Sequence, residues 1–283
     1  MPLSEAQITE FRSGVLRHFS EEGRDFPWRR TRDPWLILTS EIMLQQTRIE
    51  TVLARWDSWI SAYPTPAALS AAPLSEVLAC WKGLGYNRRA LALRNAAVRI
   101  VRDHGGAVPE SEEDLRSLPG VGAYTARAVR AFAFGLPGIV IETNIRAVFL
   151  FYFFQDRDGV PDRDLEPYVD AVLDRDDPRT WYYALMDYGA ALKKREPNPS
   201  RRSASYARQS PFEGSRRQVR SAVLHTLSAR GPLAQADLRE AAAERVGPYA
   251  RDPEFDGRLA RAIKELESEG FVEEKDGVLG LKD

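Results

Sequence analysis

Apolar residues recur at helical spacing over most of the first two-thirds of the chain. Residues 88–103, for example, carry Leu91, Leu93, Ala96 and Ile100, a pattern typical of an amphipathic helix. Comparable patterns predict helices over residues 51–63, 74–81, 124–134, 144–154, 164–173 and 180–193. Strand patterns are scarce before residue 210, so the chain is predicted to be all-α over this part.

Two further helices are predicted from their capping signals. Asp33 followed by Pro34 predicts a helix that runs to about Thr47, because aspartate is a favoured N-cap and proline suits the first helical position. Residues 111–114 resemble a capping box and predict a short helix that ends near residue 118.

The helical pattern breaks between residues 193 and 220. Nine residues in this stretch are Lys or Arg and only two are acidic, and prolines interrupt it repeatedly. Such a composition is typical of a solvated connector, and its positive charge also suits nucleic-acid contact. We therefore predict a domain at 1–195, a basic linker at 196–213 and a second domain at 214–283.

The second domain has a pattern of its own. Helices are predicted at residues 215–229, 235–245 and 256–270, and Asp276-Gly277 between two short apolar runs predicts a terminal hairpin. Three helices followed by a hairpin are typical of a winged-helix-like domain. Such domains bind DNA or contact other proteins, and the sequence leaves both alternatives open.

Composition narrows the class of protein. The net charge of the 283-residue chain is −1 and its pI is about 6.4, so a nucleic-acid partner requires local basic clusters. One cysteine, Cys80, and three scattered histidines predict neither a disulfide framework nor a metal site. No apolar run approaches the roughly 20 residues of a membrane helix. We expect a cytoplasmic monomer with no membrane partner, associated with the nucleoid if it is prokaryotic.

The sharpest local signal is the segment LPGVGAYTA at residues 118–126. Gly120 and Gly122 allow a tight turn and a close approach of the backbone to a partner. Because the turn leads into a helix, its outward amides form an anion site that suits a DNA phosphate. A Gly-x-Gly turn alone is only a turn, but helices on both sides indicate a helix-hairpin-helix.

Several motifs together resemble the MutY-type adenine DNA glycosylases of the helix-hairpin-helix superfamily. They are RDFPWRRTRDPWLILTSEIMLQQT at 24–47, WKGLGYNRRALALRNAA at 81–97, the hairpin, and MDYGA at 186–190. The resemblance covers about residues 20–195. It implies two helical lobes with a cleft that receives a flipped base, double-stranded DNA with a mispair or lesion as the partner, and hydrolysis of the N-glycosidic bond.

The resemblance and the chemistry together assign catalytic residues. Base excision needs one neutral carboxyl to protonate the base and one ionised carboxylate to stabilise the sugar cation. Glu41 lies at the family's acid position. Glu142 lies where the family has an Asp, with the same charge on a longer arm. Tyr124 lies where lyase-competent relatives have a Lys, so the resemblance implies a monofunctional enzyme that leaves an abasic site.

Other family positions imply contacts with DNA and with the flipped base. The implied DNA-binding residues are Gln45, Gln46, Thr47, Tyr86, Gly120, Gly122, Thr125 and Asn144, together with Arg201 and Arg202 of the basic stretch. The implied base-pocket residues are Arg24, Trp28, Leu44 and Asp187.

Two family features are missing. The four cysteines that hold an iron–sulfur cluster after MDYGA are absent, so we expect a clusterless protein with no cofactor. The terminal domain is winged-helix-like instead of the family's 8-oxoguanine-reading domain. Adenine is the first choice of excised base; thymine, uracil or another damaged base is one alternative, and a non-catalytic protein that recognises DNA structure is another.

Overall fold

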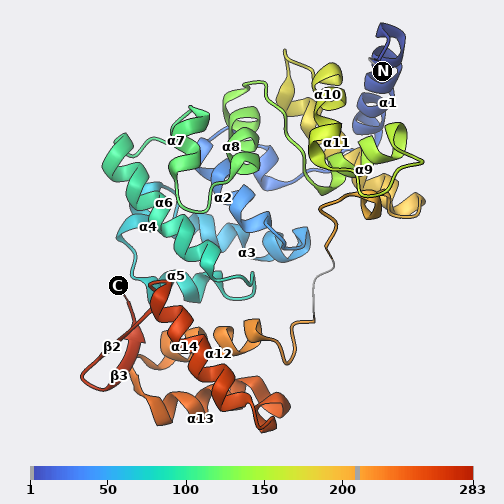
Figure 1. Ribbon diagram of the computed structural model, residues 1–283. Helices are drawn as coiled ribbons and strands as arrows, with labels where there is room; N and C mark the ends of the chain where they lie inside the picture. Colours follow the sequence, from blue (N-terminus) through green and yellow to red (C-terminus); the bar gives the residue numbers. More distant parts are fainter. Residues whose placement is uncertain (1–2, 208–210, 283) are drawn as a thin grey trace. The chain divides into compact units, whose positions relative to one another are not determined.

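The structure is a computed structural model that describes residues 3–207 and 211–282. Helices connected by short loops make up most of it, and its strands lie at the C-terminal end of the chain (Figure 1). This confirms the predicted, mostly helical fold. The chain forms two compact units, one of residues 1–41, 108–117 and 121–208 and one of residues 42–107, 118–120 and 209–283. Each unit is described by itself below.

The first unit is built on a central helix, α11, which packs against α9 and α1. Its helices are α1 (Glu5–Glu22), the larger part of α2 (Pro34–Leu44), α7 (Glu112–Ser117), α8 (Ala123–Val129), α9 (Thr143–Phe153), α10 (Asp162–Val172) and α11 (Pro178–Arg195). Helix α1 was not predicted; it begins at a capping box of Ser4 and Gln7 and buries Phe11 and Val15.

The second unit combines helices from the middle of the chain with its C-terminal segment. Its elements are α3 (Ile49–Ala62), α4 (Pro66–Ala71), α5 (Leu74–Trp81), α6 (Arg88–His104), α12 (Arg216–Arg230), β1 (Leu233–Ala234), α13 (Gln235–Val246), α14 (Phe255–Ser268), β2 (Val272–Lys275) and β3 (Val278–Leu281). Trp59 and Trp81 are fully buried and meet edge to face, 5.0 Å between ring centroids. Helix α12 packs against α5 as well as against α13 and α14.

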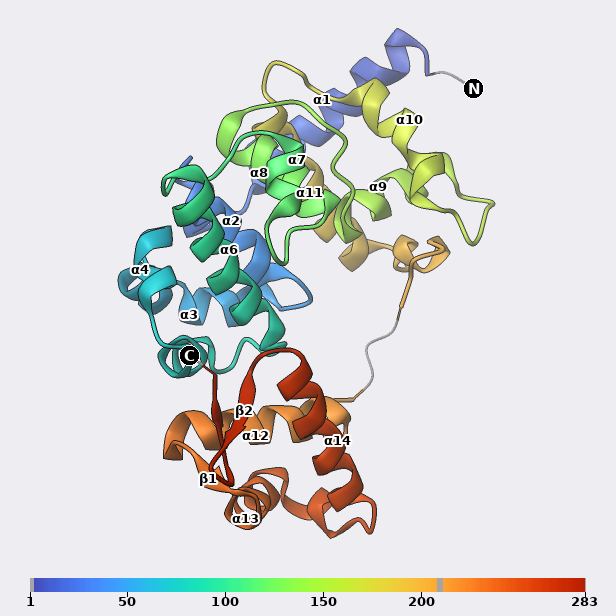
Figure 2. The same ribbon diagram turned by 60° about the vertical axis from the view of Figure 1, so that its left-hand side comes forward.

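The C-terminal segment contains the predicted three helices and hairpin. Strands β1, β3 and β2 form an antiparallel sheet in that order; β2 packs against α14 (Figure 2), and β3 packs against α12. Asp276 and Gly277 of the hairpin turn both have positive φ, as a tight two-residue turn requires. The elements agree with the prediction, and the winged-helix assignment itself stays a prediction.

Helix α2 begins as predicted but ends earlier. Asp33 Oδ1 accepts hydrogen bonds from the amides of Trp35 and Leu36, at 2.8 and 3.2 Å, and so caps the helix. The prediction that the helix reaches Thr47 is wrong, because α2 ends at Leu44. The guanidinium of Arg89, on α6, donates hydrogen bonds to the carbonyl oxygens of Ile42 and Met43. In a longer helix these oxygens would accept hydrogen bonds from backbone amides instead.

The predicted helix over 124–134 is also corrected. Helix α8 begins at Ala123 and gives way to a π-helical turn at Arg130–Phe134. In the basic stretch, α11 continues to Arg195 and a 3₁₀ turn occupies Pro199–Arg202. In the described part of the chain, no helix is both long and apolar enough to cross a membrane.

Candidate active site

Glu41 is a buried acid near the end of α2. Its exposed fraction is 7%, and Tyr124 Oη donates a hydrogen bond to its Oε2 at 3.0 Å. Burial raises the pKa of Glu41 from 4.5 to about 7; the negative charge of Glu142 adds to this, and the hydrogen bond from Tyr124 and the charge of Arg29 oppose it. Near neutral pH a large fraction of Glu41 therefore carries a proton that it can give to a substrate.

Tyr124 lies in the first turn of α8, directly after the hairpin. Gly122 is the N-cap residue of this helix. Burial, together with the charges of Glu41 and Glu142, raises the pKa of the Tyr124 phenol well above its ordinary value. The phenol thus stays neutral at any working pH and acts only as a hydrogen-bond donor toward Glu41.

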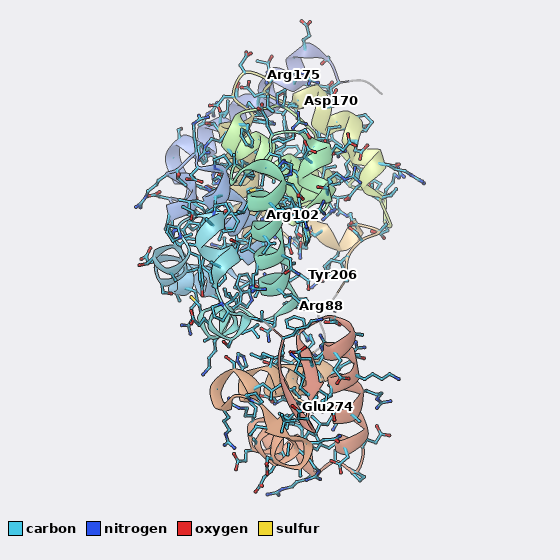
Figure 3. The ribbon with its side chains drawn as sticks, turned by 90° about the vertical axis from the view of Figure 1, so that its left-hand side faces the viewer. Arg88, Arg102, Asp170, Arg175, Tyr206 and Glu274 are labelled. Carbon is cyan, nitrogen blue, oxygen red and sulfur yellow. The ribbon has the colours of Figure 1, made fainter. Side chains whose placement is uncertain are left out.

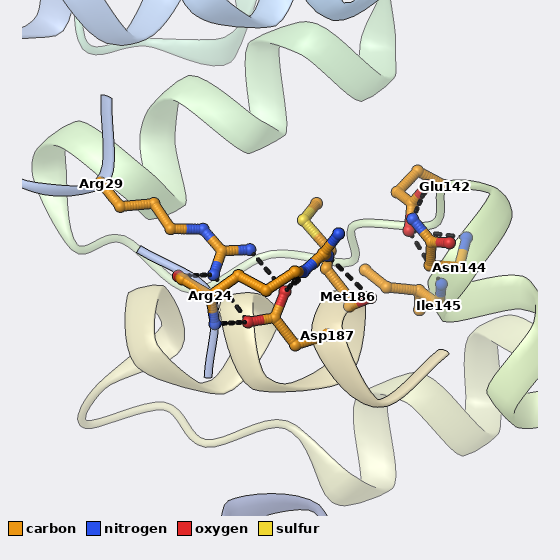
Figure 4. A network of polar contacts seen from close by, with 7 residues as sticks. All are labelled: Arg24, Arg29, Glu142, Asn144, Ile145, Met186 and Asp187. Carbon is orange, nitrogen blue, oxygen red and sulfur yellow. Dashed lines mark hydrogen bonds and ion pairs between the residues drawn. The ribbon is translucent and has the colours of Figure 1, made fainter. Parts of the chain in front are cut away.

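Glu142 is the N-cap residue of α9. Its Oε1 accepts the amides of Asn144 and Ile145 at 2.7 and 2.9 Å, and Asn144 Nδ2 donates to Oε2 at 3.2 Å (Figure 4). A carboxylate at a helix N-terminus is stabilised in its ionised form by the amides and by the helix dipole. The longer arm of Glu is held by this cap, so the site combines a buried acid, Glu41, with a carboxyl that is bound by backbone amides, Glu142.

A second polar cluster lies on α11. Asp187, 3% exposed, accepts hydrogen bonds from Arg24 Nε at 2.8 Å and from Arg29 Nη1 and Nη2 at 2.8 and 2.9 Å (Figure 4). Burial would raise the pKa of Asp187, but the bonds and charges of Arg29 and Arg24 outweigh it and lower the pKa. Asp187 is therefore ionised and balances two cations.

Sequence reasoning missed Arg29. Its guanidinium lies 4.4 Å from the ring centroid of Tyr183, and its charge lowers the pKa of Glu41. The only signal available was its place next to Trp28 within the motif at 24–47. Trp28 itself is buried and stacks on Phe26, with 5.2 Å between centroids.

Gly189, in the MDYGA motif, explains how α11 approaches Glu142. A Cβ built on Gly189 would lie 2.2 Å from the backbone oxygen of Asn144, far inside van der Waals contact. The absence of a side chain thus lets α11 pass against the first turn of α9, whose N-cap is Glu142. The motif sets the position of the ionised carboxylate.

We expect Gly189→Ala to destabilise the protein by at least about 1–3 kcal/mol, because backbone must move to admit the methyl group. Excision should fall with it, since the moving backbone carries Glu142. Gly14→Ala is the matched control: Gly14 lies inside α1 with open space around it, and the change should stabilise by about 0.5–1 kcal/mol. Thermal unfolding of both variants measures this; equal shifts would contradict it.

The remaining predicted DNA-contact residues are distributed over both units. Thr125 is buried in α8, and the side chain of Asn144 donates a hydrogen bond to Glu142. No atom lies within 4 Å of a Cβ built on Gly122, so there is open space beside this residue. Arg201, exposed, and Arg202, half-buried, lie in the 3₁₀ turn after α11.

The other predicted DNA-contact residues, and Leu44 of the predicted base pocket, belong to the second unit. Leu44 ends α2, and Gln45, Gln46 and Thr47 follow it, with Gln46 at φ +54°. Tyr86 lies in the loop before α6 at φ +50°. Gly120 has φ +79°, and a Cβ built on it would lie 2.8 Å from Ala92 Cβ, so a glycine is needed there.

The residues present do not fit an iron–sulfur cluster. Four thiolates are required and the chain has only Cys80, on α5. The segment after α11 is held by hydrogen bonds instead: Ser200 Oγ donates to Thr143 O at 3.2 Å, and Val160 N donates to Arg202 O at 2.9 Å. It thereby braces the first turn of α9. Within residues 3–207 and 211–282, no group of three or more His, Cys, Asp or Glu could hold a metal ion.

Comparison with known proteins identifies the class. Residues 39–174 match the HhH-GPD superfamily of base excision DNA repair proteins, and this range contains Glu41, Tyr124 and Glu142. Fold and site together define a helix-hairpin-helix DNA glycosylase. Within that class, the chain belongs to the adenine DNA glycosylase family, which confirms the resemblance drawn from its motifs.

The relatives match most of the chain. An adenine DNA glycosylase of Mycolicibacterium smegmatis is 36% identical over 275 residues, covering 90% of this chain and 93% of the relative. One of Mycobacterium tuberculosis is 37% identical over 247 residues, covering 80% and 81%. The solved structure of a thermostable thymine-DNA glycosylase is 31% identical with a TM-score of 0.60, covering 65% of this chain and 86% of that one.

Proposed function

We propose that this protein is a monofunctional adenine DNA glycosylase that acts as a cytoplasmic monomer on double-stranded DNA containing a mispaired adenine. The observation that carries the proposal is the contrast between two carboxyls: Glu41, buried with a pKa of about 7, and Glu142, whose Oε1 accepts two backbone amides at the N-terminus of α9. The family of its relatives supports adenine as the base.

The reaction follows from this contrast. Glu41 gives its proton to a ring nitrogen of the flipped base, and the bond from the base to C1′ breaks with its electron pair leaving on the base. The sugar cation that remains is stabilised by the negative charge of Glu142. Water then adds to C1′, and the proton it releases restores neutral Glu41.

The product is an uncut abasic strand. Cleavage by a lyase begins with an amine that forms a Schiff base with the sugar aldehyde. Tyr124, beside Glu41, offers a phenol at this position and cannot form one. Release of adenine without strand cleavage before alkali treatment is therefore expected.

The basic segment after α11 takes over DNA contact in the absence of a cluster. We expect Arg201→Gln with Arg202→Gln to weaken duplex binding and to reduce the salt slope of log K by up to about 1.8, since each lost phosphate contact removes about 0.9. Arg17→Gln with Arg163→Gln, exposed on α1 and α10, is the control and should leave both unchanged. Unaltered affinity and slope in the Arg201/Arg202 variant would reject the assignment.

The solved thymine-DNA glycosylase favours thymine as the second candidate base, and uracil or another damaged base is the next alternative. Single-turnover excision on duplexes with A, T, U, hypoxanthine or an alkylated base opposite G, C or 8-oxoguanine separates the candidates. Adenine released by the wild type and retained by Glu41→Gln supports the proposal. Release of only T or U would replace adenine as the proposed base. Binding without any excision would show that the protein is a non-catalytic DNA binder.

A further inference from the structure

The second unit contains a pocket of about 490 Å³ that is separate from the carboxyl pair. It lies between the loop that precedes α6 and one face of α12, with Phe212 beside it. Among the described residues that line it are four cationic side chains and no carboxylate: Lys82, Arg88, Arg217 and Arg220. Its volume is within the range of small-ligand sites. Arg220 is paired with Glu265 and Glu269, and Arg88 lies 3.8 Å from Glu269, so Lys82 and Arg217 are the cations that we assign to an anion.

Two aromatic side chains give the pocket a second kind of surface. Tyr86 is held by Arg217, whose Nη1 donates to the phenol oxygen at 2.8 Å and whose guanidinium lies 5.5 Å from the ring centroid. Phe212 is 51% exposed, unusual for so large an apolar side chain. Aromatic faces beside cationic groups are the combination that binds unpaired nucleotides, through base stacking and phosphate contact.

The pocket is connected to the loop that is predicted to contact DNA. Arg89, 8% exposed, donates to the oxygens of Leu84 and Gly85 in the pocket loop at 2.9 and 3.0 Å. The same guanidinium donates to Met43 O and to Thr47 Oγ1, at 2.8 and 2.7 Å. One buried arginine thus holds the pocket loop and the turn after α2 in a fixed relation.

The pocket between α14 and the hairpin, of about 340 Å³, is lined by charges of both signs: Lys264, Glu267 and Glu274. Figure 3 shows Glu274 on the hairpin and Arg88 at the start of α6. In a winged-helix-like domain α14 and the hairpin are the expected DNA-contacting elements, but the pocket that they line has two carboxylates beside one cation. The pocket lined by cations without a carboxylate lies on α12 and the loop before α6.

We propose that this pocket binds an unpaired nucleotide of the DNA substrate, stacking its base on Phe212 and holding its phosphate with Lys82 and Arg217; the ring of Tyr86, with the guanidiniums of Arg89 and Arg217 each 5.5 Å from its centroid, forms the wall of the pocket. The C-terminal segment therefore contacts DNA through α12, and α14 and the hairpin do not. The inference needs DNA binding but not adenine excision, so its test stands apart from that of the catalytic proposal.

The test uses the full chain with Glu41→Gln to prevent excision. The probe is a duplex with one bulged 2-aminopurine, whose fluorescence is quenched when it stacks on an aromatic ring; the fully paired duplex is the reference. Phe212→Ala should relieve quenching and weaken bulge binding by about 10-fold. Lys82→Met with Arg217→Met should weaken it by about 10-fold or more and reduce the salt slope by up to about 1.8.

Arg261→Met with Lys264→Met on α14 is the matched control, since it removes the same charge from the other face. This control should change neither the quenching of 2-aminopurine nor the affinity for the bulged duplex. The proposal is overturned if this control loses as much bulge affinity as the pocket variant, or if the pocket variants keep wild-type quenching and affinity. Lys82→Met alone, at an exposed residue, reports on the pocket even where the double variant unfolds. Saturable binding of free deoxyadenosine monophosphate without any effect on DNA binding also overturns it.

Discussion

Glu41→Gln is expected to lower the single-turnover rate of excision by about 10²- to 10⁴-fold, the usual contribution of a general acid. Gln has nearly the same shape and keeps an acceptor for the Tyr124 hydroxyl, but it has no proton to give. In the wild type the rate should fall as the pH rises through about 7, because the reactive form of Glu41 is the protonated one. The Glu41→Gln variant should lack this fall in rate, which is the alkaline limb of the pH–rate profile.

The same substitution should stabilise the protein in alkali. The pKa of Glu41 is raised in the folded state from 4.5 to about 7, so its contribution to stability is fully present below pH 4.5 and is lost as the pH rises to 7. A shift of this size corresponds to about 3 kcal/mol. Denaturant unfolding at pH 8 should therefore show Glu41→Gln to be more stable than the wild type by up to that amount.

The control for both effects is Glu50→Gln, at an exposed position in the first turn of α3. It should change neither the excision rate nor the pH dependence of unfolding. A Glu41→Gln variant that excises adenine at the wild-type rate, with the same alkaline limb, would remove Glu41 from the catalytic step. A loss of stability at pH 8 would instead show that the carboxylate form is stabilised in the fold.

The elements that sequence could predict are those whose signals are local. Asp33 caps α2 because its side chain reaches amides two and three residues away, and the Gly-x-Gly hairpin is marked by its own glycines, of which Gly120 has positive φ. The glutamates at 41 and 142 were found because each lies within a recognisable motif. The different surroundings of the two carboxyls could be anticipated only in kind, since they depend on the burial of Glu41 and on the amides of α9 that bind Glu142.

What sequence could not predict depends on distant partners. Helix α2 ends at Leu44 because Arg89, more than forty residues later, binds its last carbonyls. Arg29 is held by Asp187, 158 residues away, so its place in the site could not be read from periodicity. The motif MDYGA contains Gly189, but the reason for a glycine there is the approach of α9, which no local pattern reveals.

Glu142 is predicted to act through its charge, and three variants separate this from its role as a cap. Glu142→Gln keeps an oxygen for the amides of Asn144 and Ile145 but removes the charge, so unfolding should change by about 0.3–1 kcal/mol while excision falls by about 10²- to 10³-fold. Its alkaline limb should also move to lower pH, because the charge of Glu142 helps to raise the pKa of Glu41.

Glu142→Asp keeps both the charge and a favoured N-cap residue, so its stability and the pH of its alkaline limb should be close to those of the wild type. The shorter arm moves the carboxylate by about 1 Å, which can cost about 100-fold in rate. Glu142→Ala should lose the cap, the charge and about 1 kcal/mol of stability together. If Glu142→Gln excises as fast as the wild type, Glu142 acts only as a helix cap. If Glu142→Asp excises faster than the wild type, the longer side chain of Glu142 lowers the excision rate. The alkaline limb decides between charge and geometry, because only loss of the charge can move it.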